Sequence, residues 1–184
     1  MPLPWMEHSR TQIAETRVFT VWSTQRASPR TGAVHTFGLI DCPDWVNVVP
    51  LTDTGELVMI EQFRHGISAV TLEVPGGMVD PGESPLEAAR RELLEETGYA
   101  CREIRPLGAV HPNPALQPNR CHSFVALGCH KVCEPHFDST EDCRLKVVQA
   151  DQAGALVGDG SITHALVITA FSYAWLQGYL PIKP

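Results

Sequence analysis

Short runs of alternating apolar and polar residues near the start of the chain predict strands. Residues 16–24 alternate in this way and are rich in β-branched side chains, which is typical of a half-buried strand. A turn rich in Ser, Pro and Gly at residues 28–32 separates this run from a second one at residues 34–41. The two runs predict an N-terminal β-hairpin or small sheet, whereas the first ten residues are expected to form a loose arm.

The remainder of the chain alternates between strand and helix patterns. Strands are predicted over residues 45–52, 56–64, 71–74, 101–110, 121–129 and 143–148, and helices over residues 85–97, 150–157 and 161–177. Helices distributed among strands predict an α/β protein, an α/β/α sandwich with a mixed sheet between two helical layers. We therefore divide the chain into N-terminal strands at residues 1–42 and a larger domain at residues 43–184.

The helix at residues 85–97 has the clearest boundaries in the sequence. Ser84 is an N-cap residue, Pro85 occupies the first helical position, and Glu87 follows the cap by three residues, as a capping box requires. Gly98 is expected to end the helix. The helical period places Leu86, Ala89, Leu93 and Thr97 on the stripe that faces the sheet.

Three acidic residues occupy an adjacent stripe of the same helix. Glu92 and Glu96 are one turn apart and Glu95 flanks them, so their mutual repulsion costs about 0.2–0.5 kcal/mol per neighbouring pair. A solvated acidic face is the alternative reading. The preceding Pro75-Gly76-Gly77 is expected to turn sharply, so that backbone carbonyls point toward these acids. Such hard oxygen ligands suit Mg²⁺ or Mn²⁺.

Composition and charge exclude several classes of protein. With 14 Lys and Arg against 21 Asp and Glu, the net charge of −7 argues against binding nucleic acid through bulk charge. No run approaches the about 18 apolar residues of a membrane span, and no signal peptide is visible. The six cysteines are expected to be free thiols in a cytoplasmic protein. Cys129, Cys133 and His136 could be read as a zinc site, but a fourth ligand and a C-x2-C pair are absent.

The acidic helix and the loop before it resemble a known motif. The Nudix box, G-x5-E-x7-R-E-U-x-E-E-x-G-U, is matched by Gly77, Glu83, Arg91, Glu92, Leu93, Glu95, Glu96 and Gly98, and departs only at Tyr99, where a small aliphatic residue is usual. The flanks resemble the ADP-ribose pyrophosphatase and nucleoside-diphosphate-sugar hydrolase branch of this family over about residues 16–176. They carry Glu61-Gln62-Phe63-Arg64, Leu72-Glu73-Val74-Pro75-Gly76-Gly77, and Pro114 fifteen residues after the box.

The resemblance implies the Nudix α/β/α fold and a metal-dependent hydrolase. The implied metal ligands are the Gly76 carbonyl, Glu92, Glu96 and, shared or indirect, Glu95, which would hold two or three Mg²⁺ ions, with Mn²⁺ as the expected substitute. Gly77, Glu83 and Arg91 are interpreted as structural support, with Arg91 reaching back to Glu83. Glu141, in the loop before the last strand, matches the family's general base best; Asp142 is the competing candidate, and Glu95 a further catalytic one.

Several residues are expected to bind the substrate, each with a purely structural alternative. Arg64 is expected to clamp a phosphate, unless it forms a surface ion pair. Trp45 or Trp22 is expected to stack on the nucleobase, unless it is core. Arg30 is assigned to phosphate or ribose, and Pro114, Asn119 and Arg120 to the loop that meets the distal sugar. In this branch the N-terminal strands are often exchanged between subunits, so a homodimer is expected.

The reaction implied by the resemblance is hydrolysis of a nucleoside diphosphate sugar. ADP-ribose would give AMP and ribose 5-phosphate; a nucleoside diphosphate hexose with another base is the alternative substrate. A second alternative is a Nudix-fold sensor that binds such a ligand without cleaving it. The complete set of acidic box positions favours an enzyme over a sensor. Neither nucleic acid nor a membrane is expected as a partner.

Overall fold

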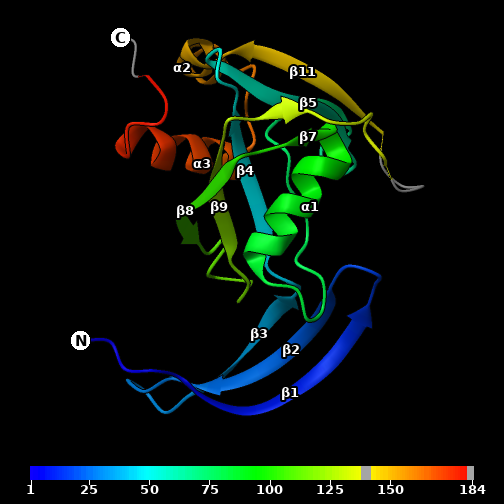
Figure 1. The fold of residues 1–184 in the computed structure, drawn as a ribbon. Coiled ribbons are helices and arrows are strands. Elements are labelled where there is room, and N and C mark those ends of the chain that lie inside the picture. The colour runs from blue at the N-terminus through cyan, green and yellow to red at the C-terminus, as the bar shows by residue number, and fades with distance from the viewer. Residues whose placement is uncertain (138–141, 182–184) are drawn as a thin grey trace. The chain divides into compact units, whose positions relative to one another are not determined.

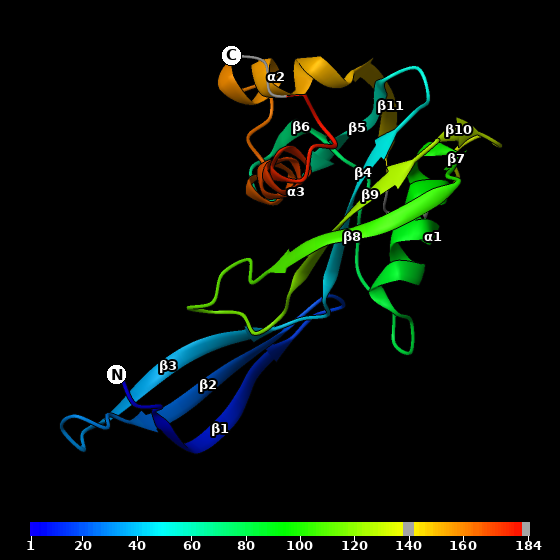
Figure 2. The ribbon, with the colours of Figure 1, turned by 60° about the vertical axis from the view of Figure 1, so that its left-hand side comes forward.

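The computed structural model describes residues 1–137 and 142–181 and divides into two compact units (Figures 1 and 2). The first unit combines residues 1–43 with residues 111–120, and the second contains the rest of the chain. No helix in the described part of the chain is long and apolar enough to cross a membrane.

The first unit is a three-stranded antiparallel sheet in the order β1-β2-β3. Its strands are β1 (Met6–Glu15), β2 (Thr20–Ala27) and β3 (Val34–Asp41). The expectation of a loose arm over the first ten residues is wrong from Met6 onward, since β1 pairs along its whole length with β2. Every residue of β1 is exposed, so the strand is held by backbone hydrogen bonds and carries no hydrophobic pattern. The segment 111–120 joins this unit where the Ile40 N–H donates to the Leu116 carbonyl, at 2.9 Å.

The second unit is built around a six-stranded mixed sheet in the order β11-β5-β4-β9-β8, with β6 added against β5. Its strands are β4 (Trp45–Leu51), β5 (Glu56–Arg64), β6 (Ala69–Glu73), β8 (Glu103–Val110), β9 (Cys121–Leu127) and β11 (Cys143–Gln149). Two short strands, β7 (Tyr99–Ala100) and β10 (His130–Lys131), pair separately. Among the strands in the described part of the chain, only β4 and β9 pair in parallel, so the predicted mixed sheet is confirmed.

Helices cover both faces of this sheet. The helices are α1 (Pro85–Thr97), α2 (Ala153–Gly158), which follows a 3₁₀ turn at Ala150–Gln152, and α3 (Ala165–Leu176). Alternate residues of β4 serve two cores: Val46 and Val48 pack with α1, whereas Val49 and Leu51 pack in the core that contains α3. Figure 2 shows α1 and α3 on opposite sides of β4. The predicted α/β/α architecture is therefore correct.

The boundaries predicted for α1 are confirmed residue by residue. The Ser84 hydroxyl accepts from the Glu87 N–H, and the Glu87 carboxylate accepts from the Ser84 N–H, which completes the capping box. Gly98 ends the helix with a φ of 72°. One buried position was predicted wrongly, because Leu86 is 41% exposed. Leu86 lies in the first turn, and the helical period specifies a face of the helix but not how far the sheet extends beneath it.

Candidate active site

The glycine turn after β6 brings backbone and carboxylates together. The Pro75 and Gly77 carbonyls accept hydrogen bonds from Val48 and Val46 of β4, each at 2.9 Å. The Gly76 N–H instead donates to the Glu96 Oε2 atom of α1, at 2.8 Å. Gly76 is thus the residue of the turn whose backbone N–H faces the acids.

Two of the acids on α1 are buried although their carboxylates are charged. Glu96 is 2% exposed and Glu92 is 7% exposed. Burying a carboxylate is costly unless a partner or a cation compensates its charge. Two buried carboxylates beside a backbone turn provide the hard oxygen donors that Mg²⁺ prefers, so the residues present fit a divalent cation.

Glycine is needed in this turn because of close approach. A Cβ atom on Gly77 would collide with the Glu92 carboxylate, and one on Gly76 would collide with the Val46 carbonyl and lie 2.8 Å from the Asn47 Oδ1 atom. Neither glycine has a positive φ. Close approach, and not a positive φ, therefore requires glycine here: the Glu92 carboxylate occupies the space that a side chain at position 77 would fill.

Gly77→Ala should reduce activity much more than stability. The atoms nearest to the added methyl group belong to the end of the flexible Glu92 side chain, which can move away at small cost to folding. The displaced carboxylate then leaves the acid cluster, and we expect kcat to fall about 10²-fold, as for other misplaced catalytic groups. Initial rates and thermal unfolding measure the two effects. Gly154→Ala is the control, because Gly154 has open space around it and a negative φ. Gly82→Ala is unsuitable because Gly82 has a φ of 86°. A Gly77→Ala enzyme as active as the Gly154→Ala enzyme would contradict the assignment of Glu92.

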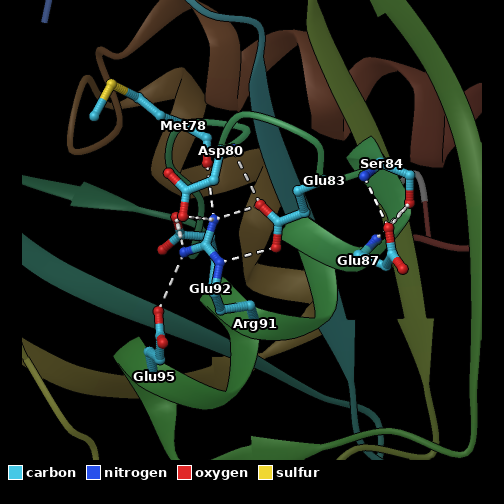
Figure 3. Close-up of polar contacts among 8 residues, drawn as sticks. All are labelled: Met78, Asp80, Glu83, Ser84, Glu87, Arg91, Glu92 and Glu95. Atoms are coloured by element: carbon cyan, nitrogen blue, oxygen red, sulfur yellow. Dashed lines mark hydrogen bonds and ion pairs between the residues drawn. The ribbon is translucent and has the colours of Figure 1, made fainter.

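Arg91 lies at the centre of a network of carboxylates (Figure 3). Its Nε and Nη2 atoms donate to the two carboxylate oxygens of Glu83, at 3.0 and 2.9 Å, and Nη2 also donates to the Met78 carbonyl, at 2.9 Å. Its Nη1 atom donates to Glu92, at 2.8 Å, and to Glu95, at 3.2 Å. The hydrogen bonds with Glu83 raise the pKa of Arg91, and Arg91 lowers the pKa of Glu83. The structure therefore contains the Arg91–Glu83 pair, together with contacts to Glu92 and Glu95 that were not predicted.

Arg91→Ala should harm stability more than chemistry. The variant removes the link between the 78–83 loop and α1, and we expect the free energy of unfolding to fall by about 1–2 kcal/mol, since charged hydrogen bonds here are partly exposed. Chemical denaturation measures this loss, and the exposed neighbour Arg90→Ala is the matched control. Unchanged stability with lost activity would instead show that Arg91 serves the site, directly or by orienting Glu92 and Glu95.

A family model described as the NUDIX domain matches residues 43–170 of the chain. The chain belongs to the Nudix family. It is 29% identical over 140 residues to the ADP-ribose pyrophosphatase of Bacillus subtilis (strain 168), covering 76% of each chain. It is 31% identical over 142 residues to the methanol dehydrogenase activator of Bacillus methanolicus, covering 77% of each. A solved structure described as the crystal structure of an ADP compounds hydrolase shares the fold, with a TM-score of 0.85 at 24% identity over 97% of both chains.

These findings make the chain a Nudix hydrolase with ADP-ribose pyrophosphatase relatives. Glu92 and Glu96, which α1 brings beside the glycine turn, are both acids of the Nudix box. Among the described residues, no three His, Cys, Asp or Glu side chains converge closely enough to hold a metal ion by themselves. Backbone, water or substrate oxygens are therefore needed to complete the coordination of a cation.

Arg64 forms an ion pair with a residue to which the sequence assigned no role. Its Nε and Nη2 atoms donate to the two carboxylate oxygens of Glu73, at 2.7 and 2.6 Å. The structural alternative predicted for Arg64 was a surface ion pair. An ion pair is present, but its carboxylate partner is buried, since Glu73 is only 2% exposed. The one sequence signal for Glu73 is a charged residue in an otherwise apolar strand end, Leu72-Glu73-Val74.

The remaining substrate candidates are divided between the two units. Trp45 is half-buried in the second unit, where it pairs with Met78. The first unit contains Arg30, Pro114, Asn119 and Arg120. Asn119 is buried and donates from Nδ2 to the Pro43 carbonyl, at 3.0 Å, so its side chain anchors the 111–120 loop. Glu141 lies outside the described residues; Asp142 is exposed immediately before β11.

In the described part of the chain, which contains all six cysteines, none forms a disulfide, as predicted. Cys129 is buried, where desolvation raises its pKa to about 12, and it donates to the Ala126 carbonyl at 3.4 Å. Cys133 is exposed. The cytoplasmic location inferred from these thiols stays a prediction.

Proposed function

We propose that this Nudix hydrolase is a Mg²⁺-dependent pyrophosphohydrolase that uses water to cleave ADP-ribose into AMP and ribose 5-phosphate. The observation that carries the proposal is the pair of buried carboxylates, Glu92 and Glu96, beside the backbone of Gly76. The choice of substrate is supported by relatives named ADP-ribose pyrophosphatase in Bacillus subtilis and Escherichia coli.

The Gly76 carbonyl, Glu92, Glu96 and Glu95 would hold the metal. When bound, two or three Mg²⁺ ions, or Mn²⁺ in their place, would balance the negative charge of the diphosphate and lower the pKa of the attacking water. Arg91 holds Glu92 and Glu95 in place through hydrogen bonds. Arg64 binds a phosphate oxygen, and Glu141 takes a proton from the attacking water. Gly77 and Glu83 support the loop.

The other substrate residues bind the two ends of the molecule. We assign Trp45 to the nucleobase, Arg30 to ribose or phosphate, and Pro114, Asn119 and Arg120 to the wall near the distal sugar. The anchoring of Asn119 to Pro43 supports a role in holding this wall rather than in direct contact with the sugar.

The first unit carries features that support a homodimer. A large aromatic side chain, that of Phe37, is 40% exposed on it. On β2, the Trp22 Nε1, Thr24 Oγ1 and Arg26 Nε atoms are buried without a hydrogen-bond partner among the described residues. Alternation places these three residues on one face of the sheet, where Phe37 is the cross-strand neighbour of Thr24. A second copy of the chain would cover the exposed Phe37 side chain on this face.

Light scattering should give the full chain twice the mass of one subunit. Phe37→Glu places a charge on the face proposed to be covered, and we expect it to weaken dimerisation by at least about 10-fold, since aromatic residues dominate such interfaces. Thr36→Glu is the control, because Thr36 is equally exposed but lies on the opposite face of β3. A monomeric wild-type protein with full activity would contradict the proposed assembly.

A substrate panel tests the proposed function. ADP-ribose, ADP-glucose and UDP-glucose are each incubated with the protein and Mg²⁺, and released phosphomonoesters are converted by a phosphatase to inorganic phosphate. We expect ADP-ribose to have the highest kcat/KM. A preference for a hexose would favour the alternative substrate class, and binding of ADP-ribose without phosphate release would favour a sensor.

A further inference from the structure

The pair formed by Arg64 and Glu73 lies along one face of the hairpin of β5 and β6. Arg64 is the last residue of β5 and Glu73 the last of β6, and the two strands pair from Ile60↔Glu73 to Arg64↔Ala69. The Glu73 Oε1 atom accepts from Arg64 Nε, at 2.7 Å, and from the Thr71 hydroxyl, at 2.5 Å. The Oε2 atom accepts from Arg64 Nη2, at 2.6 Å. Both oxygens of Glu73 are therefore used to hold one guanidinium and one hydroxyl.

Glu73 is a poor choice for stability alone. Its side chain is 2% exposed, whereas that of Arg64 is 40% exposed. Burial by itself would raise the pKa of Glu73, but the hydrogen bonds from Arg64 and Thr71 outweigh it and lower that pKa. Since an apolar residue often packs in place of a buried ion pair at no loss of stability, the pair is better explained by what it does to the exposed partner, Arg64.

The position of the pair connects it to the acid cluster. Glu73 precedes Gly76 by three residues, and the intervening Pro75 carbonyl is bonded to β4. The nearby charge of Glu96 raises the pKa of Arg64, after the larger effects of Glu73. The Arg64 guanidinium is therefore tied to the chain segment that carries Gly76 and lies within electrostatic reach of Glu96.

The geometry leaves one edge of the guanidinium for another ligand. Glu73 occupies the Nε and Nη2 side, and among the described residues no hydrogen bond from Arg64 Nη1 is found. A planar guanidinium fixed on one edge presents its remaining N–H groups in a set direction, which suits a phosphate oxygen. We propose that Glu73, fixed by Thr71, is a positioning residue that holds Arg64 in the orientation for binding the diphosphate of the substrate. The proposal rests on the proposed function through the role of Arg64.

A double-mutant cycle tests whether Glu73 acts through Arg64. The variants are Glu73→Gln, Arg64→Ala and the double variant, and the probe is methylenediphosphonate, whose binding is measured by calorimetry with Mg²⁺ present. The amide of Gln would oppose an N–H of Arg64, so we expect Glu73→Gln to weaken binding about 10-fold, as loss of a charge-assisted hydrogen bond does. In the Arg64→Ala background the same substitution should have no further effect. Glu61→Gln is the control. Because Glu61 lies on the opposite face of β5 from Arg64, the Glu61→Gln protein should bind the probe as tightly as the wild type.

Kinetics on ADP-ribose provide a second measurement. We expect Glu73→Gln to raise KM by a similar factor while kcat changes by less than about 3-fold, a pattern that a general loss of folding would not give. Thr71→Val removes the hydroxyl, which bonds to Glu73 at 2.5 Å and also contacts the Gln62 carbonyl at 3.2 Å. It replaces Glu73→Gln in the cycle if that variant does not fold, and we expect it to weaken probe binding about 3-fold.

Three results would overturn the proposal: equal losses from Glu73→Gln with and without Arg64, normal probe binding in both Glu73→Gln and Thr71→Val, or no binding of the probe to the wild-type protein. The probe has neither nucleoside nor sugar, so its binding does not depend on the substrate. A wild-type protein that binds the probe, shows the coupling and leaves ADP-ribose intact would support the positioning role while contradicting the proposed function.

Discussion

Glu92→Gln or Glu96→Gln should lower kcat for ADP-ribose hydrolysis by about 10²–10³-fold without unfolding the protein, a loss typical of removing one group that stabilises developing charge. Both side chains are buried beside the glycine turn, and Gln has nearly the same shape as Glu. The substitution removes one negative charge from the cation site. At position 96 the amide oxygen can still accept the Gly76 N–H, so the turn keeps its anchor.

Initial rates at saturating Mg²⁺, together with thermal unfolding, measure these effects. Glu87→Gln is the matched control on the same helix, because Gln also serves in a capping box and Glu87 does not contact the acid cluster. Near-wild-type activity of either Glu92→Gln or Glu96→Gln would contradict the metal-site assignment.

Glu141→Gln should lower kcat by about 10²–10⁴-fold with little change in KM, as loss of a general base does. Box glutamates that bind a cation are poor bases, because the ion holds their lone pairs. A carboxylate outside the box, such as that of Glu141, is free of that constraint. Glu141 precedes Cys143, the first residue of β11, by two residues, and Cys143 pairs with Gln62, two residues before Arg64 on β5.

The adjacent Asp142→Asn is the comparison, and we expect it to cost much less activity. A severe loss in Asp142→Asn with a mild one in Glu141→Gln would shift the base assignment by one residue. If neither substitution matters, the base lies elsewhere, and Glu95 is the next candidate to substitute.

Local signals explain which parts of the fold could be predicted. The predicted ends of α1 were correct because Ser84, Pro85 and Gly98 specify them through short-range hydrogen bonds and backbone angles. The strand β1 was missed because it buries none of its residues, and hydrophobic alternation reports burial rather than backbone pairing. Leu86 was misplaced because the extent of the sheet under a helix depends on contacts distant in sequence.

The candidate site likewise has a part that the sequence predicts and a part that it does not. The grouping of Glu92 and Glu96 follows from helical spacing, so it could be predicted. The bonds from Arg91 to Glu92 and Glu95 depend on side-chain conformations that spacing does not specify. The partner of Arg64 depends on the β5–β6 register, which brings Glu73 and Thr71 to its side, and no local pattern in the sequence specifies that register.

The central claim is metal-dependent cleavage of the diphosphate of ADP-ribose, and phosphorus NMR of that reaction tests it most directly. ADP-ribose is incubated with the purified protein and Mg²⁺ in water enriched in oxygen-18, with a parallel sample containing excess chelator. We expect the two diphosphate resonances to be replaced by those of AMP and ribose 5-phosphate only in the Mg²⁺ sample, with the heavy oxygen in one product identifying the phosphorus that water attacks. Persistence of the diphosphate resonances with Mg²⁺, or equal cleavage in the chelator sample, would contradict the account.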